Sequence, residues 1–252
     1  MISEPFATGN SFIHRLDPRI RVGLTCGYAF VVALSYQFSV LIIALVFSAL
    51  LVVISQVSLI QVIKRMLLVN ALIFLLWLLL PLTFHGDVLT TIGGFTIYRS
   101  GVVLAAQITL KSNAILLAFI ALVATMSLAT LGHSLYRLHV PEKMVHLLLM
   151  TYRYVFVIEQ EYLRLVRAAK IRGFRPGTNT NTYRTYAYVV GMLFVRAASR
   201  AERVHQAMQC RGFKGKFHSL QEFQINTASW IFAILMTVVI VWLALMEWSS
   251  FI

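Results

Sequence analysis

Residues 22–63 read "VGLTCGYAFVVALSYQFSVLIIALVFSALLVVISQVSLIQVI" and contain no Asp, Glu, Lys or Arg. A helix needs about 20 apolar residues to cross the hydrocarbon core of a bilayer, so this run is long enough for two spans. We expect a turn between them near Tyr36 to Ser39. Only 12% of the chain is charged, against about 25% in an ordinary soluble domain. The sequence therefore predicts a membrane protein.

Three further charge-free runs are each long enough for one span. They cover residues 66–86, 112–136 and 223–246. The expected fold is thus all-α and polytopic, with about five transmembrane helices. The sequence leaves open whether residues 97–111 form an outer amphipathic helix or belong to the fourth span.

The distribution of positive charge predicts the orientation in the membrane. The chain has 22 Lys and Arg residues. Three lie before the first span, two are Lys64 and Arg65, and 15 lie within residues 137–222, which makes 20 in three segments. Because basic residues accumulate on the cytoplasmic side, we expect a cytoplasmic N-terminus and an outer C-terminus. The charged segment before the first span is too long and too mixed for a signal peptide, so we expect no cleaved leader.

A basic insert interrupts the series of spans. Residues 137–222 hold 15 basic and 5 acidic residues, and we expect them to form two long amphipathic cytoplasmic helices. The first begins after Pro141 and stops at Gly173 and Pro176, and the second runs from about Thr182 to Arg211. The predicted organisation is residues 1–136 with four spans, the helix pair 137–222, and a last span in 223–252.

An Arg-Gly-Phe-basic sequence ends both predicted helices. It reads Arg172-Gly173-Phe174-Arg175 in the first copy and Arg211-Gly212-Phe213-Lys214 in the second. A Gly after a terminal Arg is a common helix cap, but a cap alone does not require the repeated Phe and basic residue. The repeat instead favours two docking tips, each offering a guanidinium group to a carboxylate with an aromatic anchor beside it.

These residues resemble the transmembrane (T) component of energy-coupling factor (ECF) transporters, an ABC importer family. That family carries two Ala-Arg-Gly signatures on its coupling helices; here Ile171 and Cys210 replace the Ala residues. The N-terminal stretch "SFIHRLDPRIRVGL" is similar to a family segment, and "SRAERVHQAMQCRGFKG" to the cobalt-transport CbiQ-like branch. The matching residues of the N-terminal segment are His14, Leu16, Asp17, Pro18 and Arg19.

The resemblance implies a coupling subunit in the prokaryotic inner (plasma) membrane. It would transmit the motion of an ABC ATPase dimer to a substrate-binding (S) subunit, for uptake of cobalt or nickel, with a small accessory membrane subunit as a further possible partner. The sequence has no G-x-x-x-x-G-K-[ST] motif, so we expect no catalysis and no cofactor in this chain, with ATP and magnesium on the partner ATPase.

Several other readings stay open at this stage. The basic insert would also suit a membrane scaffold that binds anionic lipid, and the chain could be a T component for a vitamin. Nucleic acid also fits a basic patch, but lipid is the ordinary partner beside a membrane, so we expect no nucleic acid. An intramembrane enzyme is disfavoured because the spans hold almost no ionisable residues. An ordinary ABC permease usually couples through one short helix.

Histidines, one lysine and the two cysteines receive no functional role. We expect no metal site at His133, His139 and His146, because Pro141 interrupts a common helix, and only a low chance of one at His85 with Asp87. Lys111 is expected to reach the outer interface, and Asp17 to tether the N-terminal segment. The cysteines, Cys26 and Cys210, are expected to be reduced.

Overall fold

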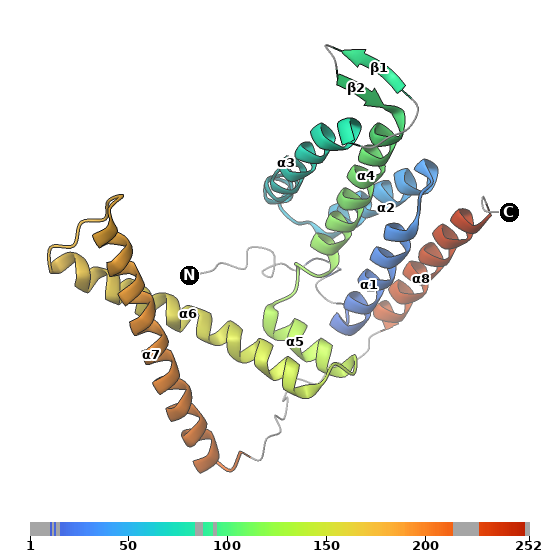
Figure 1. Ribbon diagram of the computed structural model, residues 1–252. Helices are drawn as coiled ribbons and strands as arrows, with labels where there is room; N and C mark the ends of the chain where they lie inside the picture. The colour runs from blue at the N-terminus through green and yellow to red at the C-terminus, as the bar shows by residue number, and fades with distance from the viewer. Residues whose placement is uncertain are drawn as a thin grey trace. The chain divides into compact units, whose positions relative to one another are not determined.

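The computed structural model describes residues 11, 13, 16–83, 88–92, 95–213 and 227–249. Eight helices and one hairpin follow one another along this part of the chain (Figure 1). Their bounds are α1 Pro18–Leu34, α2 Phe38–Ser55, α3 Leu59–Thr83, β1 Val88–Ile92, β2 Phe95–Tyr98, α4 Arg99–Leu122, α5 Leu128–Arg137, α6 Glu142–Ile171, α7 Thr180–Cys210 and α8 Thr227–Trp248. The predicted all-α class is confirmed; the short antiparallel hairpin was not predicted.

The chain divides into two compact units. We call one the bundle unit, which contains α1 to α5, the hairpin and α8, and the other the helix pair, which consists of α6, α7 and the residues joining them. Each unit is described by itself below.

Long apolar helices form the bundle unit. Among the described residues, α2, α3, α4 and α8 are long and apolar enough to cross a membrane. Five spans were predicted, and the remaining one corresponds to α1. This helix has 17 residues, which is at the lower end of the length that spans a bilayer. In the bundle α4 packs against α1, α2 and α3, and α8 packs beside α1 (Figure 1).

The predicted spans agree with these helices to different degrees. Most of the run 22–63 forms two helices, α1 and α2, with the turn at residues 35–37, and its last residues begin α3 at Leu59. The span predicted at 112–136 is wrong, because α4 covers residues 99–122 and a separate helix, α5, begins at residue 128. The break has a local cause: the Ser127 side chain accepts a hydrogen bond from the Thr130 backbone N–H and caps α5. Residues 99–111 therefore belong to the fourth long helix.

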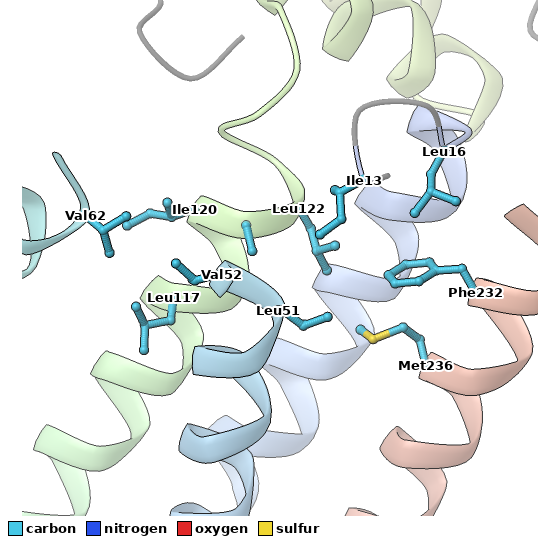
Figure 2. Packing of buried hydrophobic residues seen from close by; sticks show 11 residues of the cluster. Ile13, Leu16, Leu51, Val52, Val62, Leu117, Ile120, Leu122, Phe232 and Met236 are labelled. Carbon is cyan, nitrogen blue, oxygen red and sulfur yellow. The ribbon is translucent and has the colours of Figure 1, made fainter. Parts of the chain in front are cut away.

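Buried hydrophobic side chains from separate helices form the core of the bundle unit (Figure 2). Leu51 of α2, Leu122 of α4 and Met236 of α8 are at most 2% exposed and belong to one cluster. Ile13 and Leu16, which precede α1, pack into the same cluster. These two residues before α1 are thus part of the core.

Polar contacts secure the turn between α1 and α2. The Lys111 ammonium group of α4 donates to the Ala33 carbonyl oxygen at 2.9 Å and lies 4.2 Å from the centre of the Tyr36 ring. The backbone N–H of Tyr36 donates to the Glu247 carboxylate of α8 at 2.8 Å. These contacts explain how a lysine is accommodated in the fourth long helix, because its charge faces a carbonyl oxygen and an aromatic ring.

Candidate functional site: two matching helix tips

The two Arg-Gly-Phe sequences end α6 and α7 with the same backbone geometry. Arg172 and Arg211 are the C-cap residues, and the following glycines, Gly173 and Gly212, have φ of +86° and +79°. A residue in this left-handed region closes a helix in the Schellman motif, and glycine adopts it without steric cost.

The hydrogen bonds of the two tips also correspond. In the first tip, the N–H of Phe174 donates to the Ala169 carbonyl oxygen at 3.1 Å, and in the second the N–H of Phe213 donates to the Met208 carbonyl oxygen at 3.0 Å. The N–H of each glycine donates to the carbonyl oxygen one residue nearer the helix end, from Gly173 to Lys170 at 3.0 Å in the first tip and from Gly212 to Gln209 at 2.9 Å in the second. Both tips are therefore complete Schellman motifs, which present the side chain of the cap arginine in an equivalent backbone setting.

The cap arginine of each tip is exposed, as are Lys170 and Arg175 beside the first one, and the two phenylalanines are half-buried. Phe174 packs edge-to-face on Tyr186 of α7, with ring centres 5.6 Å apart. Phe213 lines the groove between α6 and α7. Both phenylalanines thus pack within the helix pair and support the tips. Their role as anchors on a partner stays a prediction.

Residues replacing the Ala of the signature are also exposed. Ile171, at 88%, is the most exposed large apolar side chain in the described part of the chain, and Cys210 is exposed as well. An isoleucine with so little cover beside a cap arginine gives the first tip an apolar contact point. Sequence reasoning treated Ile171 only as a departure from the signature.

Between α6 and α7 lies a mostly apolar groove with a volume of about 820 Å³. Its lining includes Met150 and Val155 of α6, and Val204 and Met208 of α7. Burial in this groove lowers the pKa of His146, and the charge of Glu142 opposes that shift. The imidazole is therefore neutral at neutral pH and adds no charge to the groove.

In the N-terminal family segment, Asp17 and Pro18 start α1. The Asp17 carboxylate accepts from the Arg19 N–H at 2.9 Å, and Pro18 occupies the first turn, which suits its fixed φ. The Asp17 backbone N–H donates to the Ser229 hydroxyl of α8 at 3.1 Å. This geometry ties the segment to the last helix. His14 and Lys214 lie outside the described residues.

Arg21 is a buried residue that sequence reasoning missed. Its side chain is 1% exposed in the bundle unit and donates to the hydroxyl of Thr125, after α4. The only sequence signal was its position one helical turn after Asp17, at the edge of the apolar run.

Metal ligands do not gather in the described part of the chain. No group of three or more His, Cys, Asp or Glu side chains there could hold an ion. His133 lies in α5 and His146 in α6, while His139 lies between the two helices with φ of +65°. His85 and Asp87 lie outside the described residues.

The long apolar helices and the separate pair of long helices with matching tips define a polytopic membrane protein. The chain belongs to the CbiQ family, described as cobalt transport protein, whose family model matches residues 9–223. It is thus a member of the family of transmembrane components of ECF transporters.

Relatives bear the two names used in this family. The cobalt transport protein CbiQ of Salmonella typhimurium is 30% identical over 122 residues, which cover 48% of this chain and 54% of that protein. The ECF transporter transmembrane protein EcfT of Listeria innocua is 26% identical over 85% of both chains, and that of Leuconostoc gelidum is 26% identical over 96% of both. The CbiQ match therefore spans about half of that relative, and the EcfT matches span most of theirs.

We expect a modest, local loss of stability when the tip glycines are replaced. In Gly173→Ala and Gly212→Ala a Cβ meets nothing within 4 Å, so the change acts through the positive φ alone. The left-handed conformation costs a residue with a Cβ about 1–2 kcal/mol. Hydrogen exchange should therefore become about tenfold faster at the Phe174 and Phe213 amides. Gly191→Ala is the matched control, because Gly191 lies inside α7 with nothing within 4 Å, and faster tip exchange in that variant would contradict the prediction.

Proposed function

We propose that this chain is the non-catalytic coupling subunit of an ECF-type importer. Arg172 and Arg211 dock on two ABC ATPase subunits, and movement of these subunits on ATP changes the angle between α6 and α7. The helix pair passes this change to a substrate-binding membrane subunit. The single observation that carries the proposal is the pair of matching Schellman tips, each with an exposed cap arginine.

Two equivalent tips suit a partner ATPase that is a dimer of similar subunits, with one docking site on each. A guanidinium group forms two parallel hydrogen bonds with a carboxylate, which gives both strength and a defined direction. A helix end held in this way can follow a rigid-body movement of its partner. An arrangement with a single tip would receive only one of the two movements.

The proposed orientation has a cytoplasmic N-terminus in the prokaryotic inner membrane. In that orientation the hairpin and Arg99 lie outside, and the basic helix pair lies on the side of the ATPase. The proposed cargo is cobalt or nickel, supported by the family match over residues 9–223. A vitamin is the second candidate, because the matches to proteins named EcfT cover more of the chain.

Co-purification tests the proposal directly. The tagged wild-type chain, extracted from its own cells in mild detergent, should bring an ABC ATPase and a small membrane protein, identified by mass spectrometry. Recovery of the ATPase should persist in high salt, because an arginine buried in a pocket of its partner is screened less than a surface charge. Recovery of lipid alone, or of an ATPase that is lost in moderate salt, would favour the basic scaffold.

A further inference from the structure

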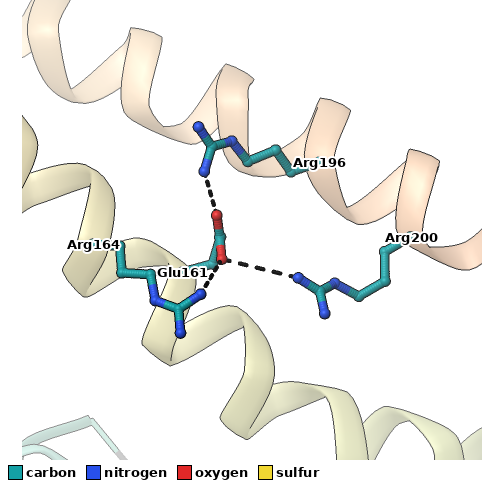
Figure 3. Close-up of polar contacts among 4 residues, drawn as sticks. All are labelled: Glu161, Arg164, Arg196 and Arg200. Atoms are coloured by element: carbon teal, nitrogen blue, oxygen red, sulfur yellow. Dashed lines mark hydrogen bonds and ion pairs between the residues drawn. The ribbon is translucent and has the colours of Figure 1, made fainter.

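A cluster of four charged side chains joins α6 to α7 (Figure 3). The carboxylate of Glu161, on α6, accepts a hydrogen bond from Arg196 of α7 and lies 3.9 Å from the guanidinium group of Arg200, also on α7. Arg164, one turn along α6, contacts the same carboxylate at 3.4 Å. The Glu161 side chain is only 12% exposed, although its three partners are between 42% and 68% exposed.

The cluster lies where the groove between the two helices ends. On α6 the lining residues run from Glu142 to Glu161, and on α7 they begin at Leu193 and Arg196. The groove therefore opens from Glu161 and Arg196 towards the start of α6 and the end of α7. The carboxylate occupies the vertex of the angle that the two helices make.

Each tip lies beyond the vertex on its own helix: Arg172 at the end of α6 away from the groove, and Arg211 at the end of α7 towards which the groove opens. At 1.5 Å per residue, Arg172 is about 16 Å from Glu161 and Arg211 about 22 Å from Arg196. A rotation of roughly 10° at the vertex would thus move the second tip by about 4 Å. A contact at the vertex can control the separation of the tips without touching either one.

Two cations on α7 face one carboxylate on α6. Arg196 and Arg200 are four residues apart, so they share one face of α7. Arg196 is the closer partner, and Arg200 lies at the outer limit of an ion pair. The hydrogen bond from Arg196, together with the charges of all three arginines, holds the pKa of Glu161 below its ordinary value, so the carboxylate is ionised at neutral pH.

We propose that Glu161 is the pivot of the helix pair, and that its carboxylate passes between Arg196 and Arg200 as the angle between α6 and α7 changes. An ion pair is then kept in both positions. Because the partly exposed Arg196 and Arg200 offer the carboxylate similar ion pairs, exchanging one for the other opposes the movement only weakly. Arg164 holds the carboxylate from its own helix and keeps it directed at α7. The inference rests on the proposed function for its purpose, but the pivot itself is a property of this chain alone.

Spin labels at the two tips measure the angle directly. The native Cys210 and an Ile171→Cys substitution place exposed labels next to the cap arginines, and Cys26→Ser removes the other cysteine. The distribution of distances between the two labels is recorded by double electron–electron resonance on the full chain in nanodiscs, without ATPase. Glu161→Gln should at least double the width of the distribution. Glu202→Gln removes an exposed acid from α7 and serves as the matched control.

The arginine variants test the exchange. Arg196→Gln should shift the distribution by a few ångströms to one new narrow maximum, where Arg200 is the partner, and adding Arg200→Gln should make it as broad as in Glu161→Gln. The charge swap Glu161→Arg with Arg196→Glu should restore a narrow distribution. A Glu161→Gln distribution that matches Glu202→Gln would overturn the pivot, and an Arg196→Gln distribution already as broad as Glu161→Gln would overturn the exchange. Failure to recover an ATPase with the wild type would overturn the proposed function and leave these distances unaffected.

Discussion

In the Arg172→Glu/Arg211→Glu variant the ABC ATPase is expected to disappear from the co-purified complex, while the membrane protein itself is still produced. Truncating one side of a buried arginine–carboxylate pair costs about 2–5 kcal/mol of binding, largely because the other charge stays buried without a partner. Each tip should thus account for about a 30-fold to 4,000-fold change in affinity. Reversing the charge adds repulsion to that loss, so the double variant should bind below detection.

A double variant with the same change in charge gives the control. Arg167→Glu/Arg203→Glu alters two exposed arginines, one on α6 and one on α7, that lie away from the tips. If general attraction between a basic surface and an acidic partner held the complex, the two double variants would be equally impaired. Recovery of the ATPase with the control alone would assign binding to the tips. Equal recovery with the wild type and the tip variant would show that Arg172 and Arg211 are only helix caps.

Substitution by lysine separates charge from geometry. Arg172→Lys and Arg211→Lys keep the positive charge but lose the planar pair of donors that matches a carboxylate. Recovery of the ATPase should therefore fall in each lysine variant. Equal recovery with lysine and arginine would mean that the tip acts as a point charge.

The helix pair was the part of the fold that the sequence predicted best. Gly173, Pro176 and Gly212 stop helices for reasons of backbone geometry, and such signals act locally. The structure places the ends of α6 and α7 at these residues. The equivalence of the tips was also visible as a repeat, although the direction in which Phe174 and Phe213 point was not, because it depends on contacts with other parts of the pair.

Charge counting failed where a charge is neutralised by distant residues. Lys111 ended the charge-free run, so the fourth span was predicted at 112–136 and the assignment of residues 97–111 stayed open. In the structure Ala33 and Tyr36 stabilise the Lys111 ammonium group from the α1–α2 turn. Glu161 escaped notice for the same reason, since its partner Arg196 is 35 residues away in sequence. A window of local sequence cannot reveal pairs of this kind.

The fit between α3 and α4 gives the second large effect, at Gly101. A Cβ at this position would lie 2.5 Å from the carbonyl oxygen of Leu80 and 2.8 Å from the Cα of Pro81. Both atoms belong to the backbone of α3, so no side-chain rotation can relieve the overlap and the helices must separate. Forcing extra atoms into a packed contact costs about 1–3 kcal/mol of stability. The loss should be larger for Gly101→Val than for Gly101→Ala, because valine adds more atoms.

Helix α3 is only lightly buried, with 11% of its apolar window covered. Its polar contacts with α4 include the paired amides of Asn70 and Asn113, at 3.1 Å, and the bond from Trp77 to Thr109, at 2.9 Å. The loss at Gly101 should therefore detach the C-terminal half of α3. Trp77 reports this by fluorescence when Trp230, Trp242 and Trp248 are replaced by Phe.

Thermal unfolding in detergent measures the effect of the Gly101 variants. Gly101→Val should lower Tm by about 5 °C or more, since 1 kcal/mol corresponds to about 2–4 °C in a protein of this size. Gly23→Ala is the control, because Gly23 lies in α1 with nothing within 4 Å of a Cβ, and alanine favours the helix. Its Tm should stay level or rise slightly. A Gly101→Val protein as stable as the control would mean that α3 and α4 do not approach each other this closely, because a close backbone contact leaves no room for a larger residue.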